Sequence, residues 1–143
     1  MKVLIDTNVV LDAIANREPF YPHAQKIIKL ILDNKIEGYV TANSITDIYY
    51  IARKHLDHDN LRNTMRSLFD TFRIVDVLEA DCHKALDFPL DDYEDALLIV
   101  CSDRAAVDYI ITRDEELLNK AKSSAPVISP VDFINTISST NHE

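Results

Sequence analysis

The sequence predicts an α/β domain with a central, mainly parallel sheet that is flanked by helices on both faces. Two observations favour this fold class. Short apolar runs of strand type alternate along the chain with segments whose apolar residues recur at helical spacing. The chain contains a single glycine, Gly38, and nowhere carries the tight-turn signal of a β-hairpin. Strands that are joined by helices, without hairpins, are typical of a parallel sheet.

The first half of the chain predicts two strands and four helical segments. The opening apolar run ends abruptly at Asp6, and Pro19 and Pro22 stop the helical pattern that follows it. Ser44 and Asp47 have the spacing of a capping box at the start of a helix. The strands are expected at residues 2–5 and 39–42, and the helices at residues 8–16, 24–32, 44–56 and 60–72.

The second half predicts three more strands and four more helices. Asp91 and Glu94 give a second cap signal before an apolar helix, and a last helix is expected to start near Pro130. The strands are expected at residues 74–78, 109–112 and 126–129, and the other helices at residues 80–88, 96–101 and 115–122. A length of 143 residues suggests one domain. We expect residues 1–137 to form it and residues 138–143 to be a polar tail.

The composition is acidic. The chain has 24 Asp and Glu against 15 Lys and Arg, which gives a formal net charge of -9. This charge argues against a nucleic-acid-binding module that works by neutralising phosphates alone. An acidic protein can still act on nucleic acid if some of its carboxylates bind divalent cations, whose charge attracts the phosphate.

Several common sites are excluded. A Walker A loop, a dinucleotide-binding fingerprint and a G-x-S-x-G nucleophile elbow all need more glycines than Gly38. Cys82 and Cys101 form no C-x-x-C and the histidines form no H-E-x-x-H, which argues against a structural or protease-type zinc site. The sequence shows neither a signal peptide nor a run of transmembrane length. We therefore expect a cytoplasmic protein with reduced cysteines and no membrane partner.

Four aspartates lie where strands end or helices begin. Asp6 ends the first strand and Asp114 follows the strand at residues 109–112, while Asp47 and Asp95 lie in the first turns of helices. In parallel sheets of this kind, sites lie outside the carboxyl ends of the strands, so these carboxylates could converge there. Oxygen ligands without histidine or cysteine suit Mg2+ or Mn2+ better than zinc.

Each aspartate also has a purely structural interpretation. Asp6 and Asp114 could cap the helices that follow them, and Asp47 and Asp95 could stabilise the positive end of a helix dipole. The surrounding acidic block is typical of a solvated helix face and comprises Asp87, Asp91, Asp92, Glu94 and Asp95. Only the coincidence of all four positions favours a site.

Basic, aromatic and apolar residues give weaker signals. Arg53, Lys54 and Arg113 are candidate phosphate contacts, although cations near a helix C-terminus also stabilise the helix dipole. Tyr49 and Tyr50 could stack on a base, but helical spacing puts one of them in the core. The same helix has apolar residues on more than one face, which indicates an interface between two copies of the chain. These residues are Ile45, Ile48, Tyr49, Ile51 and Ala52.

Four short segments, taken in order, carry a family resemblance. They are residues 4–12 (LIDTNVVLD), 44–50 (SITDIYY), 92–97 (DYEDAL) and 108–114 (DYIITRD). In the first segment, an acid lies at the end of a strand and is followed by Thr and Asn. These segments resemble the motifs of PIN-domain proteins, and the likeness extends to VapC-like ribonuclease toxins. The resemblance runs from about Lys2 to Phe133 and so spans nearly the whole chain.

The resemblance implies a PIN fold, with an acidic pocket that binds Mg2+ or Mn2+. By position it assigns metal binding and catalysis to four acids, Asp6, Asp47, Asp95 and Asp114. It makes Thr7, Asn8 and Thr112 polar helpers. The chain departs from the family pattern at Asp47, where Glu is more common, and at residues 116–117, where Glu-Leu stands in place of Asp-Phe.

The leading hypothesis is a metal-dependent endoribonuclease that hydrolyses RNA phosphodiester bonds. The resemblance further implies that the protein is the toxin of a toxin–antitoxin pair, with an antitoxin protein as partner, and that it forms a homodimer. The alternative is a catalytically silent PIN-like module that binds a protein. A third possibility is an aspartyl-phosphate phosphatase. That class is expected to have a D-x-D motif near the first strand, but here Asn8 occupies the position of the second acid.

Overall fold

A five-stranded parallel sheet forms the centre of the computed structural model, which describes residues 1–120 and 122–140. The strand order is β3-β2-β1-β4-β5, and every neighbouring pair is parallel. The strands are β1 (Lys2–Ile5), β2 (Glu37–Thr41), β3 (Arg73–Val75), β4 (Tyr109–Ile111) and β5 (Val127–Ile128). The predicted α/β class with a parallel sheet is therefore confirmed.

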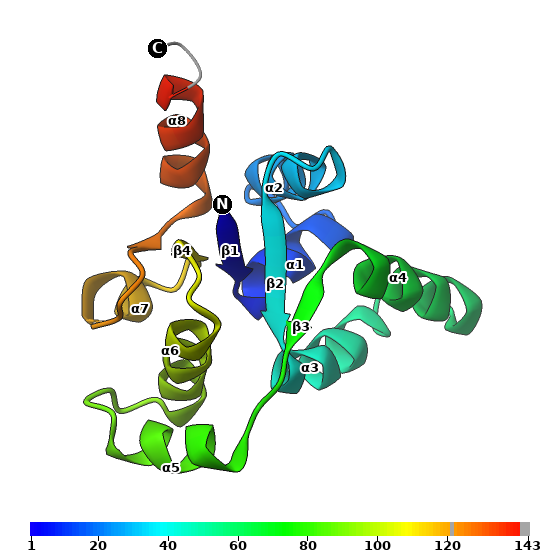
Figure 1. The fold of residues 1–143 in the computed structure, drawn as a ribbon. Helices are drawn as coiled ribbons and strands as arrows, with labels where there is room; N and C mark the ends of the chain where they lie inside the picture. Colours follow the sequence, from blue (N-terminus) through cyan, green and yellow to red (C-terminus); the bar gives the residue numbers. More distant parts are fainter. Residues whose placement is uncertain (121, 141–143) are drawn as a thin grey trace.

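Helices cover both faces of this sheet (Figure 1). They are α1 (Thr7–Ile14), α2 (Tyr21–Leu32), α3 (Ala42–Ala52), α4 (His58–Thr71), α5 (Glu79–Asp87), α6 (Tyr93–Ala105), α7 (Glu115–Lys120) and α8 (Pro130–Thr140). Val3 and Ile5 of β1 pack into a core with α1, α2, α3, α4 and α8, whereas Leu4 packs into a second core with α5, α6 and α7. This alternation along β1 is what a strand buried on both faces requires.

Two predicted elements have different bounds in the structure. The strand expected at residues 74–78 ends at Val75, because Val75 pairs with Thr41, the last residue of β2, and no neighbouring strand continues beyond it. The helix expected at residues 96–101 extends over Tyr93–Ala105. Residues 96–102 are all buried, so this helix lacks the apolar stripe from which its length could be recognised.

Both predicted cap signals were misplaced. The side chain that caps α6 belongs to Asp92, whose Oδ1 accepts a hydrogen bond from the Asp95 N–H at 3.0 Å. Helix α3 begins at Ala42, before Ser44, and the Ser44 hydroxyl donates to the Thr41 carbonyl at 2.7 Å. Asp47 therefore lies in the second turn of α3 rather than in a capping box.

The C-terminal helix extends into the segment that was expected to be a tail. Helix α8 continues to Thr140, so residues 138–140 are helical, while residues 141–143 of the predicted tail lie outside the described residues. Phe133 anchors α8 to the first core and is fully buried. Within the described part of the chain, no helix is long and apolar enough to cross a membrane.

Candidate active site

Asp6 connects the two central strands. Its backbone N–H donates to the Ile111 carbonyl of β4 at 2.9 Å. Its carboxylate accepts two hydrogen bonds of 2.8 Å, one from the Thr7 N–H to Oδ1 and one from the Thr112 hydroxyl to Oδ2. Burial raises the pKa of Asp6, and the two hydrogen bonds oppose that rise. Asp6 caps α1, but a cap does not require the second bond, which joins Asp6 to the residue that follows β4.

Asp114 lies beside Asp6 and is also a helix cap. Its Oδ1 accepts hydrogen bonds from the N–H groups of Glu116 at 2.9 Å and Leu117 at 3.3 Å, in the first turn of α7. Its own N–H donates to the Thr112 hydroxyl at 3.0 Å. The single hydroxyl of Thr112, which is fully buried, thus links Asp6 to Asp114. The capping interpretation holds for Asp114, and its charge also raises the pKa of Asp6 and Asp95.

Asp95 lies in the first turn of α6 and contributes a third carboxylate. Its pKa is raised to about 7, first by burial and then by the negative charges of Asp92, Asp114 and Asp6. A carboxylate is affected in this way only when the other charges are close and poorly screened. The charges of Asp6, Asp92 and Asp114 therefore act on Asp95, and we call this group of acids at the carboxyl end of the sheet the acidic pocket.

Asp47 reaches the same pocket through a residue that the predicted site did not include. A hydrogen bond between the Glu94 and Asp47 carboxyl groups is the largest cause that raises the pKa of Glu94 to about 7. Burial and the charges of Asp47, Asp92 and Asp6 raise that pKa further. Glu94 thus bridges α3 and α6. Glu94 lies in the acidic block at residues 91–95, but an acidic block is equally typical of a solvated helix face.

The four predicted acids thus belong to one electrostatic group, because their charges raise the pKa values of Asp6, Asp95 and Glu94, and the group also includes Asp92 and Glu94, which were not predicted. Carboxylates that raise one another's pKa form a donor set suited to a hard divalent cation, whose charge would relieve their repulsion. Among the described residues, no three His, Cys, Asp or Glu side chains are arranged closely enough to hold a metal ion in common. The chemistry of the donors, which are carboxylates without histidine or cysteine, fits Mg2+ or Mn2+.

Arg113, a predicted phosphate contact, has a structural role. Its Nε donates to Asp12 Oδ2 at 2.8 Å and its Nη2 to Asp12 Oδ1 at 3.2 Å, while its guanidinium lies 4.1 Å from the centre of the Phe20 ring. Arg17 donates to the same carboxylate at 3.0 Å. Asp12 is only 1% exposed, so it is a buried anion that two arginines neutralise. The positive charge of Arg113 also opposes the rise in the pKa of Asp6.

The apolar coverage of α3 is largely used within the chain. Ile48 and Ala52 are fully buried, and the other three apolar residues of that set are partly buried against the same core. Helix α3 packs against both α1 and α4, which is why more than one of its faces is apolar. Of the two tyrosines, Tyr49 is half-buried and Tyr50 is 51% exposed, as helical spacing predicted.

Comparison with known proteins agrees with this fold. Ribonuclease VapC1 of Aquifex aeolicus (strain VF5) is 24% identical over 119 residues, which cover 80% of this chain and 82% of that protein. A toxin–antitoxin complex from Klebsiella pneumoniae contains a similar chain, with a TM-score of 0.66 and 15% identity over 90% of this chain and 97% of that one.

Mycobacterium tuberculosis VapC20, described as a sarcin–ricin loop cleaving toxin, has a TM-score of 0.64 and 10% identity. The similarity covers 80% of this chain and 91% of that toxin. At such low identities these two solved structures support the fold alone. The sequence profile of the PIN domain family matches residues 2–116, which include Asp6, Asp47, Asp95 and Asp114. The chain therefore belongs to the PIN domain family.

Proposed function

We propose that this protein is a metal-dependent endoribonuclease that hydrolyses RNA phosphodiester bonds. The observation that carries the proposal is the convergence of carboxylates from four separate segments, with the pKa values of Asp95 and Glu94 both raised to about 7. Such a repulsive cluster costs stability, which is typical of functional sites. The name of the Aquifex relative, a ribonuclease, supports the choice of RNA as substrate.

The cofactor in this proposal is Mg2+ or Mn2+. Asp6, Asp47, Asp95 and Asp114 would supply its ligands, which requires their carboxylates to move closer together than they lie in the described structure. The bound ion would lower the pKa of a water molecule and neutralise charge on the phosphate. The surrounding residues of the chain orient these ligands. The Thr112 hydroxyl holds Asp6, and the first turn of α7 holds Asp114 through Oδ1. The Asp92 cap fixes the turn of α6 that carries Asp95.

The biological role in this proposal is that of a toxin, with an antitoxin protein as partner. The Klebsiella neighbour was solved as a toxin–antitoxin complex, which supports this role. We also propose that the protein assembles as a homodimer in the cytoplasm. Because Ile48 and Ala52 are buried within the chain, the dimer contact would have to use other residues.

The second candidate is a catalytically silent PIN-like module that binds a protein partner. A module of this kind has no need for a repulsive acidic pocket. The two functions therefore differ in their response to metal ions, which stabilise and activate the nuclease only.

The test is cleavage of single-stranded RNA by the purified protein, with Mg2+ or Mn2+ and with excess chelator. We expect cleavage that requires the cation and is lost in Asp95→Asn, because Asn lacks the charge that a hard cation needs. Asp91→Asn removes the same charge from a neighbouring exposed residue and should cleave normally. Robust cleavage in chelator, or by Asp95→Asn, contradicts the proposal.

A further inference from the structure

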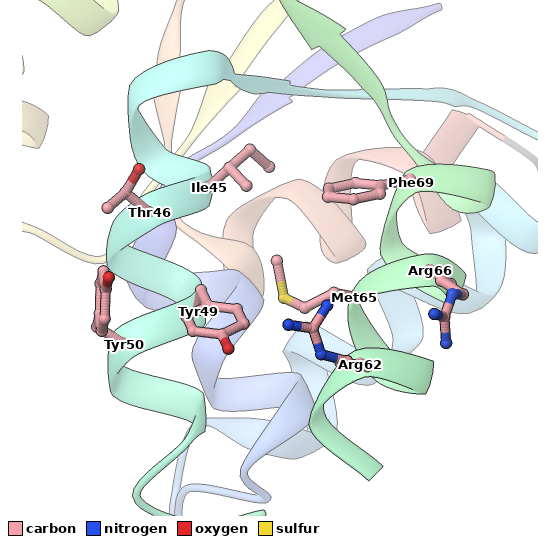
Figure 2. Close-up of a pocket in the computed structure, with 8 residues that line it drawn as sticks. All are labelled: Ile45, Thr46, Tyr49, Tyr50, Arg62, Met65, Arg66 and Phe69. Carbon is pink, nitrogen blue, oxygen red and sulfur yellow. The ribbon is translucent and has the colours of Figure 1, made fainter. Parts of the chain in front are cut away.

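Helices α3 and α4 enclose an open groove with a volume of about 410 Å3 (Figure 2). Helix α3 contributes Ile45, Thr46, Tyr49 and Tyr50, and α4 contributes Arg62, Met65, Arg66 and Phe69. In Figure 2, Tyr49 and Phe69 lie between the two helices, and the Arg62 side chain extends from α4 into the same space. The groove therefore combines aromatic rings with guanidinium groups.

Two of the aromatic side chains of the groove are exposed. Tyr50 is 51% exposed and Phe69 is 47% exposed. The Tyr50 ring packs edge-on against Tyr49, with 5.3 Å between the ring centres and an angle of 84°, and the Arg53 guanidinium lies 5.1 Å from its centre. The ring is thus held in place while part of it remains open to a ligand. Held aromatic faces are the surfaces on which unpaired bases stack.

The arginines of the groove have no carboxylate partner. Arg62 Nε donates to His58 Nε2 at 3.2 Å, and Arg66 Nη1 donates to Asn63 Oδ1 at 3.2 Å. Neither arginine forms an ion pair with any of the residues described, and no acidic side chain lines the groove. On a chain with a net charge of -9, the charged side chains that line the groove are all positive, which suits an anionic ligand.

Helix α3 contributes residues both to the groove and to the acidic pocket. Thr46 lines the groove and is followed directly by Asp47, which bonds to Glu94 in the pocket. Tyr50 lies three residues after Asp47, so the two side chains are neighbours on the helix surface. A ligand that extends from the pocket along α3 would therefore reach Tyr50 and then the arginines of α4.

We propose that the α3–α4 groove binds the single-stranded RNA that flanks the scissile phosphate. This inference rests on the proposed ribonuclease function and names the surface that holds the substrate. Unpaired bases stack on Tyr50 and Phe69, and Arg62 and Arg66 contact backbone phosphates. Paired bases cannot expose their faces in this way, so the groove selects single strands.

A second copy of the chain fits the groove less well. Around a two-fold axis it would bring uncompensated arginines close to one another, where like charges repel. A protein segment rich in acids would satisfy the arginines but would not explain why the exposed ring of Tyr50 neighbours Asp47 on α3. Both occupants are distinguished from RNA by the experiment that follows.

The experiment measures the affinity of the protein for a fluorescent single-stranded oligoribonucleotide by anisotropy, over a range of salt concentrations. The parent protein carries Asp95→Asn so that the probe stays intact. We expect Arg62→Gln/Arg66→Gln to bind more weakly and to reduce the slope of log K against log salt by about 1.4, because two phosphate contacts are lost. Lys26→Gln/Lys84→Gln, on α2 and α5, removes the same charge elsewhere and should change neither quantity.

Variants of Tyr50 test stacking separately from charge. Tyr50→Ala and Tyr50→Leu should each weaken binding about tenfold without changing the salt dependence, because both lack the ring face. Tyr50→Phe keeps the ring and should bind like the parent. Tyr50→Leu retains apolar bulk, so it separates the loss of the ring face from the loss of side-chain volume. Thermal melts check that each variant is folded.

The outcomes separate the groove from the proposed function. If the parent binds RNA and the groove variants match it in affinity and slope, the groove proposal fails and the ribonuclease function stands. If the groove variants change only the mass in solution, or only the capture of a partner protein, the surface is a protein interface and the groove proposal fails. If the parent binds no RNA and the wild type cleaves none, both proposals fail.

Discussion

The Thr112 hydroxyl donates a hydrogen bond to Asp6 Oδ2 at 2.8 Å across 106 positions of sequence. The same oxygen accepts the Asp114 N–H, so one buried hydroxyl fixes two carboxylate residues that leave adjacent strands. It also lowers the pKa of Asp6, against the effect of burial. Thr112 is therefore a positioning residue for the acidic pocket.

The first prediction concerns the removal of this hydroxyl. Thr112→Val should lower the rate of RNA cleavage by about 10- to 100-fold, the range found when a group that orients a metal ligand is lost. It should also reduce the free energy of unfolding by about 1–3 kcal/mol, because Asp6 and the Asp114 N–H lose a buried partner. Thr112→Ser keeps the hydroxyl and should retain most of the cleavage rate. Equal rates for the Val and Ser variants would contradict the positioning role.

A second prediction concerns Asp81, an almost fully buried acid on α5 that is not part of the acidic pocket. Its carboxylate accepts hydrogen bonds from Arg104 Nε at 3.1 Å and from the Leu78 N–H at 2.9 Å. Burial alone would raise the pKa of Asp81, but these two hydrogen bonds lower it below its usual value of 3.8. The ionised form is therefore favoured in the folded protein.

Asp81→Asn should reduce the free energy of unfolding near neutral pH by about 2 kcal/mol, the typical value of a hydrogen bond to a charged group. A carboxyl whose pKa is lowered by folding contributes stability above its unfolded pKa and loses it as the pH falls through the folded value. The difference between wild type and variant should therefore shrink below about pH 4. Asp87→Asn, an exposed acid on the same helix, should show no such difference in urea melts over the same pH range.

The fold could be predicted from the sequence where its patterns are local. The strands before Asp6 and around residues 109–112 were recognisable because short apolar runs end at polar residues. The full length of α6 was not recognisable, because a helix buried on all sides shows no periodicity. The end of β3 depends on where β2 stops pairing, which is a property of the sheet and not of the strand.

The candidate site could be predicted only in part for a related reason. Asp6 and Asp114 were identifiable because they follow strands whose carboxyl ends meet at one edge of the sheet. The contact between Glu94 and Asp47 joins two helices that are distant in sequence, so it depends on how those helices pack. The same is true of the ion pair between Arg113 and Asp12. Arg113 was expected to contact phosphate, and this ion pair gives it a structural role instead.

The third prediction concerns Gly38, the only glycine in the chain. A Cβ atom at this position would lie 2.5 Å from Ile31 Cδ1 and 2.9 Å from Phe72 Cδ1. Gly38→Ala should therefore reduce the free energy of unfolding by about 1–3 kcal/mol through overpacking. Adding Ile31→Val removes the nearest atom, so the double variant should be more stable than the sum of the two single effects. Strict additivity in denaturant melts would show that the close approach to Ile31 is not the cause.

The last prediction uses the stability of the metal-free protein to decide what Asp95 does. In chelator at about pH 8, above its pKa of about 7, Asp95 is ionised beside Asp92, Asp114 and Asp6. Asp95→Asn should relieve this repulsion and raise the free energy of unfolding by on the order of 1 kcal/mol, after solvent screening is considered. An acid that only stabilises the dipole of α6 predicts the opposite sign, a loss of about 0.3–1 kcal/mol.

Thermal melts with and without Mg2+ complete this comparison. The wild type should gain stability from Mg2+ because the cation binds the folded state only, and Asp95→Asn should gain much less because it lacks one ligand charge. Asp91→Asn removes an exposed charge outside the pocket and should respond to Mg2+ like the wild type. If Asp95→Asn is less stable in chelator and responds to Mg2+ as strongly as the wild type, then Asp95 stabilises the dipole of α6 and does not bind the cation.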